Sequence, residues 1–550
     1  MKHKRKISII IVGFVLISSL TIGFVRNDFE IAKNLDIYAT LLQQLNEHYV
    51  DGFNAGELVE ESIHAMLNKL DPYTVYYPES QIEEFKLLTT GQYGGIGALI
   101  LQDDDYVLIS EPYEGTPAFK AGLQAGDKII KVNGVDAKGK TVSDVSSILK
   151  GQPGTNVSLE ILPYGKKNTI NKNIIREEIK LPNISYSGKV SDDIGYIHLS
   201  QFTENAAADV KAAFLKLKSQ GINSLIIDLR ANGGGLLNEA VELVNLFVPK
   251  GELIVSTKGK MSNKNQMYYT RNEPIDVNIP LVVLVDEYSA SASEIVAGAI
   301  QDLDRGLVVG RRTFGKGLVQ NVVPLSYNTR LKVTVSKYYI PSGRCIQKYD
   351  YADKDIKGSS KEKSDSIATA FKTKNGRIVY DYGGVEPDIK IPAEEYSTIL
   401  ATMLENKVIF NYANDYKLKH NQLSSIKDFS ITDAIYNDFT TYFSSQEVSY
   451  ETYTEKQLKA LEKSAEDDRY AEAIKEDINQ LKQHIKKEKS KDLQRFRKEI
   501  EKLLYLEIVS RYYYQKGRIE AALYDDPQVE KVKKLLQNKE EYTKILSTQK

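Results

Sequence analysis

The sequence predicts a multidomain α/β protein, and three observations lead to this prediction. A chain of 550 residues is too long for one hydrophobic core. Apolar runs alternate with helical segments between about residues 184 and 392, as in a covered parallel sheet. Short strand-like runs precede this region and a long helical stretch follows it. With 42% apolar and 27% charged residues, the chain has ordinary globular composition, which excludes global disorder.

The N-terminus predicts a membrane segment. Basic residues at positions 2–6 precede an uncharged stretch from Ile7 to Val25. This stretch is close to the ~20 residues that cross a bilayer and longer than the ~7–15 of a cleavable signal peptide. We therefore expect residues 1–26 to be an uncleaved, single-pass signal anchor, with all that follows on the extracytoplasmic (periplasmic) side of the cell membrane. The alternative, a buried globular helix, would need a polar stripe, which this stretch lacks.

Two regions follow the anchor. Residues 27–88 have apolar side chains at near-helical spacing, so we predict an N-terminal helical region that Asp71-Pro72 interrupts. Residues 89–176 change to strand-like runs at 106–109, 128–132 and 157–161, separated by turns such as Asn133-Gly134. This pattern of short strands and turns predicts a small, mostly β module.

The rest of the chain divides into a core and an extension. In residues 177–395, buried runs at 224–228 and 281–285 are each followed by a helical pattern, at 238–247 and 293–299, which predicts an α/β core. Residues 396–550 are rich in Lys, Glu, Gln and Leu and predict a helical C-terminal extension. Its helices could mediate homo-oligomer formation or equally pack within one chain.

The β module opens on a glycine-rich loop, Tyr93-Gly94-Gly95-Ile96-Gly97-Ala98, immediately before a strand. Converging backbone amides in such a loop form a nest for an anion. With Gly115-Thr116-Pro117-Ala118 and Gly126-Asp127 downstream, the module resembles the PDZ domain of bacterial processing proteases. The resemblance implies that Gly95, Ile96, Gly97 and Ala98 bind the C-terminal carboxylate of a peptide added as a strand.

A serine-rich turn lies at a switch from strand to helix. Ser289, Ser291 and Ser293 follow the apolar run that ends at Val285 and open a helical pattern. Free amides at a helix N-terminus favour negative charge, which suits an attacked carbonyl. The alternative is that these serines only cap the helix.

A lysine between two glycines, Phe314-Gly315-Lys316-Gly317, supplies a candidate base. Burial can lower the pKa of a lysine to roughly 7–8, where it accepts a proton from a serine hydroxyl. The six histidines are scattered and none has a supporting acid at a telling spacing, which argues against a Ser-His-Asp triad.

Together, Ser-Ala-Ser-Ala-Ser-Glu-Ile and Phe-Gly-Lys-Gly resemble the signature of the carboxyl-terminal processing peptidases, the tail-specific proteases of serine peptidase family S41. The resemblance covers roughly residues 31–392 and implies a ClpP/crotonase-like α/β protease core with an inserted PDZ module. The family's spacing between nucleophile and lysine selects Ser291 as nucleophile and Lys316 as base.

The same resemblance implies further roles. Gln320 would orient the lysine amine, Asp302 would support the site, and the oxyanion would bind the backbone N–H groups of Ala292 and Gly234. Gly233 replaces a common proline. Lys150 stands where many members have an arginine linked to PDZ–core coupling, and lysine lacks the bidentate fork of arginine.

We therefore expect an exported, membrane-tethered serine endopeptidase that cuts near the C-termini of protein substrates with accessible apolar tails. It needs no metal and no other cofactor. The balance of 73 basic and 74 acidic residues argues against a nucleic-acid partner, and the single cysteine, Cys345, excludes an intrachain disulfide. The alternative function is a catalytically inert PDZ scaffold or holdase.

Overall fold

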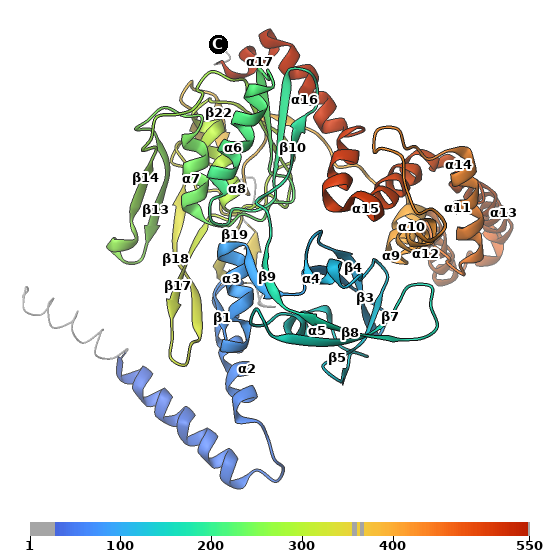
Figure 1. The fold of residues 1–550 in the computed structure, drawn as a ribbon, viewed down its shortest axis with the longest axis horizontal. Helices are drawn as coiled ribbons and strands as arrows, with labels where there is room; N and C mark the ends of the chain where they lie inside the picture. Colours follow the sequence, from blue (N-terminus) through green and yellow to red (C-terminus); the bar gives the residue numbers. More distant parts are fainter. Residues whose placement is uncertain (1–27, 355–359, 363–367, 548–550) are drawn as a thin grey trace, which may run out of the picture. The chain divides into compact units, whose positions relative to one another are not determined.

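The computed structural model describes residues 28–354, 360–362 and 368–547 (Figure 1). The predicted signal anchor, residues 1–26, lies outside the described residues. Within the described ranges, none of the helices combines the length and the apolar character needed to cross a membrane. The described chain forms two compact units, one ending at Tyr76 and one beginning at Tyr77.

The first unit is helical, as predicted. It contains a helix over residues 28–48 and α2 (Ala55–Leu67), which Asn54 caps by accepting the backbone N–H of Gly56. The predicted break at Asp71-Pro72 is present, because the Asp71 carboxylate accepts the N–H groups of Tyr73 and Thr74 in a turn. Strand β1 (Val75–Tyr77) spans the division between the units.

The β module begins in the second unit after η1 (Glu79–Gln81) and α3 (Ile82–Thr90). Its entry strand β2 (Gln92–Gly95) pairs with its exit strand β9 (Glu177–Lys180), so the module is an insertion closed by a two-stranded ribbon. Between them lies a sheet in the order β3-β4-β5-β7-β8, with β6 beside β5. The elements of this sheet and its two helices are β3 (Ala98–Asp103), β4 (Tyr106–Pro112), α4 (Pro117–Lys120), β5 (Lys128–Val132), β6 (Val135–Asp136), α5 (Val142–Leu149), β7 (Asn156–Leu162) and β8 (Ile170–Ile175).

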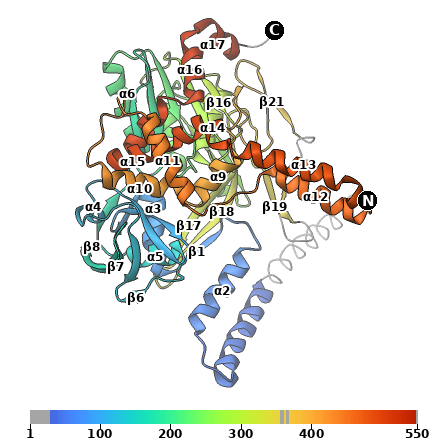
Figure 2. The same ribbon diagram turned by 90° about the vertical axis from the view of Figure 1, so that its right-hand side faces the viewer.

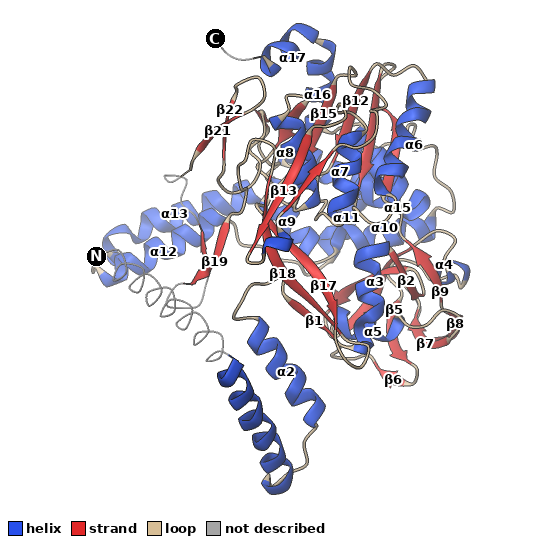
Figure 3. Cartoon of the chain, turned by 90° about the vertical axis from the view of Figure 1, so that its left-hand side faces the viewer, coloured by secondary structure: helices blue, strands red, loops and turns tan. Residues whose placement is uncertain are grey.

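The α/β core is built on a six-stranded sheet in the order β10-β11-β12-β15-β16-β23 (Figure 3). All neighbours are parallel except the edge strand β10. The predicted buried runs coincide with β12 and β15. The strands are β10 (Ile184–Lys189), β11 (Ile194–Leu199), β12 (Ser224–Asp228), β15 (Leu281–Val285), β16 (Leu307–Gly310) and β23 (Ile389–Lys390).

Helices cover both faces of this sheet, which explains why its strands are apolar throughout. One face packs against α6 (Ala206–Ser219), α7 (Leu237–Asn245) and α8 (Ala292–Asp302). The other face packs against the last two helices of the described chain, α16 (Pro527–Gln537) and α17 (Lys539–Leu546) (Figure 1). The end of the chain therefore completes the core.

A second sheet lies beside the core, in the order β1-β18-β13-β14, and β17 also pairs with β18. Two small ribbons, β19–β20 and β21–β22, follow it in the sequence. The strands are β13 (Leu253–Gly259), β14 (Gln266–Tyr269), β17 (Leu318–Pro324), β18 (Arg330–Tyr339), β19 (Tyr349–Lys354), β20 (Ser360–Glu362), β21 (Ala370–Lys372) and β22 (Ile378–Tyr380), and the short helix η2 (Ser262–Lys264) precedes β14.

The helical extension has its own apolar core, centred on Tyr412, Phe439 and Leu504. Figure 2 shows α12 and α13 side by side as a hairpin. The helices are α9 (Thr398–Glu405), α10 (Val408–Lys419), α11 (Asp433–Ser445), α12 (Tyr453–Asp467), α13 (Ala471–Lys489), α14 (Asp492–Arg495) and α15 (Arg497–Leu523). Helix α15 is interrupted at Tyr514, whose φ of 53° and ψ of −161° are not helical.

The extension also contacts the β module and the core. The Tyr164 hydroxyl donates to the Asn411 carbonyl at 3.0 Å, and the Phe119 and Tyr514 rings meet edge to face with centroids 5.6 Å apart. On the core side, Arg230 forms ion pairs with Asp228 at the end of β12 and with Asp526 at the start of α16. The extension is thus packed within the chain, one of the two arrangements that the sequence left open.

Candidate active site

A pocket of about 560 Å³ lies where the core meets the second sheet. Five of the predicted site residues line it, on four separate segments of the second unit: Ser291, Ala292, Lys316, Gln320 and Gly234. Asp302 and Lys150 do not line it. The structure therefore brings together residues that lie up to 86 positions apart in the sequence.

Ser291 occupies a strained position in the turn between β15 and α8. Its φ of 56° and ψ of −112° are rare for a residue with a side chain. Asp286 holds this turn, because its Oδ1 atom accepts the N–H groups of Tyr288 and Ser289. Ser291 directly precedes the first residue of α8 and lines the pocket.

The three serines of the turn have different environments. Ser289 and Ser293 are fully buried. Their hydroxyls donate to backbone carbonyls of the facing loop, Ser289 to Leu229 at 2.8 Å and Ser293 to Asn232 at 2.9 Å. Ser291 is the member of the three that lines the pocket.

A buried carboxylate that was not predicted from the sequence joins the turn that carries Ser291 (the serine turn) to the loop that carries Lys316 (the lysine loop). Glu294 Oε2 accepts the backbone N–H of Ser291 at 2.8 Å and that of Lys316 at 2.9 Å. Its Oε1 accepts the N–H of Gly315 at 2.7 Å and the hydroxyl of Thr313 at 2.6 Å. Burial raises the pKa of Glu294 to about 7, and these four donors oppose the rise. The Ser-x-x-Glu spacing of a helix capping box was the available signal.

Tyr338 makes a second link between the same two segments. Its ring is buried at the end of β18, and its hydroxyl donates toward the Lys316 carbonyl at 2.6 Å and the Ser291 carbonyl at 3.2 Å. Glu294 thus holds the N–H groups of Ser291 and Lys316, and Tyr338 holds their C=O groups.

Gln320 lies on β17, opposite Thr334 of β18. Its amide Nε2 donates to the Thr334 hydroxyl at 3.2 Å, which orients the amide plane. Its predicted action on the lysine amine stays a prediction.

The two predicted oxyanion donors have different surroundings. The N–H of Ala292, at the first position of α8, has no acceptor among the described residues, as is usual in the first turn of a helix. Gly234 lies against the serine turn, since a Cβ there would come within 2.8 Å of Ser291 Cβ. However, its N–H donates to Asn232 Oδ1 at 2.9 Å, so this donor is already engaged. The asparagine two residues earlier closes a local turn with this N–H, and the oxyanion role of Gly234 stays a prediction.

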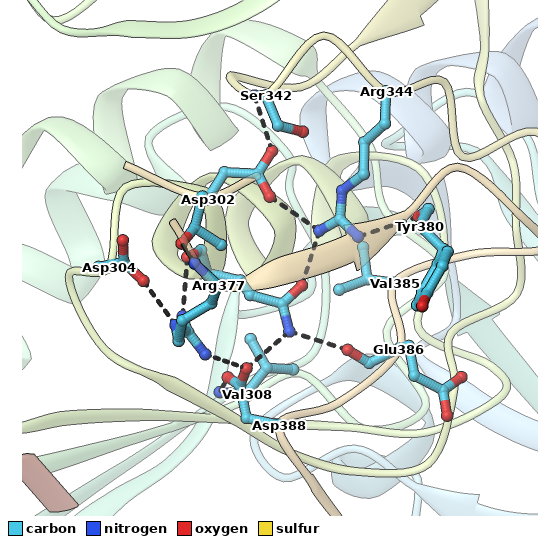
Figure 4. A network of polar contacts seen from close by, with 12 residues as sticks. Asp302, Asp304, Val308, Ser342, Arg344, Arg377, Tyr380, Val385, Glu386 and Asp388 are labelled. Carbon is cyan, nitrogen blue, oxygen red and sulfur yellow. Dashed lines mark hydrogen bonds and ion pairs between the residues drawn. The ribbon is translucent and has the colours of Figure 1, made fainter. Parts of the chain in front are cut away.

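Asp302 belongs to a buried network outside the pocket (Figure 4). It ends α8, about 16 Å along the helix from Ser291. Its Oδ1 pairs with fully buried Arg344 at 2.9 Å, and its Oδ2 accepts the N–H of Ser342. Arg377 holds the neighbouring carboxylates Asp304 and Asp388. The described contacts of Asp302 therefore anchor the C-terminal end of α8, the helix that Ser291 precedes.

The predicted carboxylate loop precedes β3, which is an edge strand of its sheet. The N–H groups of Ile96 and Gly97 have no backbone acceptor in the described part of the chain, and Gly97 has a φ of 75° that favours glycine. Helix α5 lies across β3, and its C-cap, Lys150, has its ammonium 5.9 Å from the centroid of the Tyr93 ring. The coupling role of Lys150 stays a prediction.

Three family models match the chain. Peptidase family S41 matches residues 193–357, a PDZ domain matches residues 108–163, and the "probable PDZ-protease, C-terminal helical domain" matches residues 399–536. These matches correspond to the α/β core with its second sheet, the β module and the helical extension.

Curated relatives are similar over most of their own length. A carboxy-terminal-processing protease of Bartonella bacilliformis is 34% identical over 351 residues, covering 62% of this chain and 80% of the relative. The carboxy-terminal processing protease CtpA of Bacillus subtilis is 32% identical over 358 residues, covering 63% and 76%. Among solved structures, a peptide complex of the PDZ domain of the Vibrio cholerae carboxy-terminal protease is 37% identical, covering 16% of this chain and 99% of that one, with a TM-score of 0.16.

Proposed function

Because the chain belongs to the PDZ-containing carboxy-terminal processing peptidases of family S41, we propose that it cleaves proteins near their C-termini with a Ser291–Lys316 dyad. The observation that carries the proposal is the shared pocket, which the strained Ser291 and the half-buried Lys316 both line together with Ala292. No histidine lines this pocket among the described residues, and of its lysines Lys316 is the one whose backbone Glu294 ties to that of Ser291.

The chemistry follows from these groups. The neutral amine of Lys316 takes the proton of Ser291 as its Oγ bonds to the substrate carbonyl carbon, and the oxyanion accepts the N–H of Ala292. Lys316 then gives this proton to the leaving nitrogen as the peptide C–N bond breaks, which leaves an acyl-enzyme. Water adds to the acyl carbon with the same base, and the second product leaves as a free acid. Gln320 orients the lysine amine.

In this proposal the PDZ module captures the substrate tail. The free edge of β3 can accept a peptide as an added strand, and the N–H groups of Ile96 and Gly97 can bind its terminal carboxylate. The N-terminal segment tethers the enzyme to the membrane and places its pocket on the extracytoplasmic side. The support for this tether is the basic flank and apolar run of residues 2–25.

The proposal is tested by replacing the proposed nucleophile and its neighbour in separate proteins. We expect Ser291→Ala to abolish both cleavage of unfolded casein and labelling by a fluorophosphonate probe. Ser293→Ala should retain the label, because that hydroxyl is buried and donates to Asn232. Gel-based cleavage and labelling measure both properties. If the wild-type protein neither cleaves nor takes the label, the inert scaffold alternative is favoured.

Glu294→Gln tests the link between the serine turn and the lysine loop. Each carboxylate oxygen of Glu294 accepts two hydrogen bonds. The glutamine side chain has the same shape, but its NH₂ group replaces one of these oxygens, so in either orientation the NH₂ group faces two donors that then lose their acceptor. We expect fluorophosphonate labelling to slow by about 100-fold, since each lost charged hydrogen bond costs roughly 1.5–3 kcal/mol.

The matched control for this substitution is Glu287→Gln, an exposed glutamate that pairs with Arg311 on the same turn. It should label at the wild-type rate. Equal labelling rates for Glu294→Gln and wild type would show that Glu294 does not position the two catalytic segments.

A further inference from the structure

The active-site pocket contains a second lysine to which the proposed chemistry gives no role. Lys332 lines the pocket from β18 and is half-buried. Among the described residues, its ammonium group forms neither an ion pair nor a hydrogen bond, and burial alone lowers the pKa of Lys332. A half-buried cation without a partner is unfavourable, so another group is expected to pair with it when the pocket is filled.

The register of the hairpin places Lys332 near the catalytic groups. Lys332 pairs with Val322, and Thr334 pairs with Gln320, so Lys332 and Thr334 share one face of β18. Lys332 and Thr334 lie two positions apart, which is about 7 Å along the strand. This distance equals the spacing of same-side side chains in an extended peptide. A substrate strand whose scissile bond lies at Ser291 can therefore present a side chain to Lys332 a few residues away.

The remaining pocket wall favours an anion at this position. The described lining residues include apolar side chains such as Phe85, Leu88 and Leu318, with no aspartate or glutamate. Lys316 and Lys332 are the charged groups of this described lining. A substrate carboxylate near Lys332 would thus gain an attractive partner without displacing an existing one.

We propose that Lys332 is a specificity residue that binds a carboxylate of the substrate within a few residues of the cleaved bond. This inference rests on the proposed function, because it requires the substrate to extend from Ser291 along β18. Two sources can supply the carboxylate: an acidic side chain or the C-terminus of a short substrate.

The test uses one cleavable peptide in which a single Glu or Gln is moved from four residues before the scissile bond to four residues after it. Each peptide is made with a free C-terminus and with a C-terminal amide. The wild-type enzyme should show a kcat/KM at least about fivefold higher for Glu than for Gln at one position, or for the free acid over the amide. The first result assigns the carboxylate to a side chain and the second to the terminus.

Substitutions then assign the preference to Lys332. Lys332→Met should bring the ratio close to one, and Lys332→Glu should invert it in favour of a Lys-containing peptide. Lys337→Met is the matched control, because Lys337 is an exposed lysine of the same strand that does not line the pocket. It should keep the wild-type ratio.

Two results would overturn the inference: a wild-type ratio near one at every position and terminus, or a Lys332→Met protein that loses activity equally on Glu and Gln peptides. The wild-type measurement stands even if a variant does not fold. If wild-type enzyme cleaves none of the peptides, the proposed function fails, and the inference fails with it.

Discussion

Lys316→Ala should lower kcat/KM for peptide cleavage by at least about 1,000-fold without unfolding the protein. A serine hydroxyl is a weak nucleophile without a base, and general-base catalysis contributes roughly 10²–10⁴-fold. The pocket offers no histidine among its described lining residues that could replace the lysine. The backbone contacts of residue 316 to Glu294 and Tyr338 do not use its side chain, so they survive the substitution.

The measurement is steady-state cleavage of a fluorogenic peptide, with circular dichroism to verify the fold. Lys316→Arg should be equally inactive, because a guanidinium stays protonated at any pH that the protein tolerates. Lys337→Ala removes an exposed lysine of β18 and should keep wild-type activity. Peptide cleavage by Lys316→Ala at more than about a tenth of the wild-type rate would contradict the dyad.

Removing the residues after Asp525 should prevent the α/β core from folding. This truncation deletes α16 and α17, whose buried side chains cover one face of the core sheet: Val529, Val532, Leu535, Leu536 and Tyr542. Burying each large apolar side chain contributes roughly 1.5–3 kcal/mol, so five of them match the ~5–15 kcal/mol stability of a typical domain. The truncation also removes Asp526 from Arg230 and the Tyr542 hydroxyl from the backbone of Leu281.

The expected result is an aggregated or unfolded protein with no cooperative thermal transition by circular dichroism. A single substitution, Val532→Asp, should act in the same direction by burying a charge in this layer. Lys531→Asp, at the neighbouring exposed position of α16, is the matched control and should leave the Tm within a few degrees of wild type. A truncated protein that keeps the wild-type Tm would show that the two helices are dispensable.

The sequence was informative where a local pattern determines the structure. The predicted apolar runs at 224–228 and 281–285 are the central strands β12 and β15, because a strand buried on both faces must be apolar at every position. The multidomain α/β class, with an inserted PDZ module and a helical extension, is confirmed. The family spacing selected Ser291, the serine of its turn that lines the pocket.

The rest depends on contacts that no local pattern encodes. Tyr338 reaches the Ser291 carbonyl across 47 residues, and the Tyr542 hydroxyl reaches Leu281 across 261. The helices after residue 526 look like any amphipathic pair, so their amphipathic pattern does not say which sheet they cover. Gly234 was a reasonable oxyanion donor by position, but the buried Asn232 side chain, which also donates to the Leu199 carbonyl, accepts its N–H.

The place of α16 and α17 on the core sheet has a consequence for biosynthesis. Strand β15, which precedes the serine turn, is translated early, yet one of its faces has no cover from α16 and α17 until more than 240 further residues have been made. The nascent chain therefore exposes an apolar surface throughout the production of the helical extension, and maturation ends with a long-range docking step. If α16 and α17 are required for folding, as the truncation is expected to show, the core that carries Ser291 is completed only after both helices have been made.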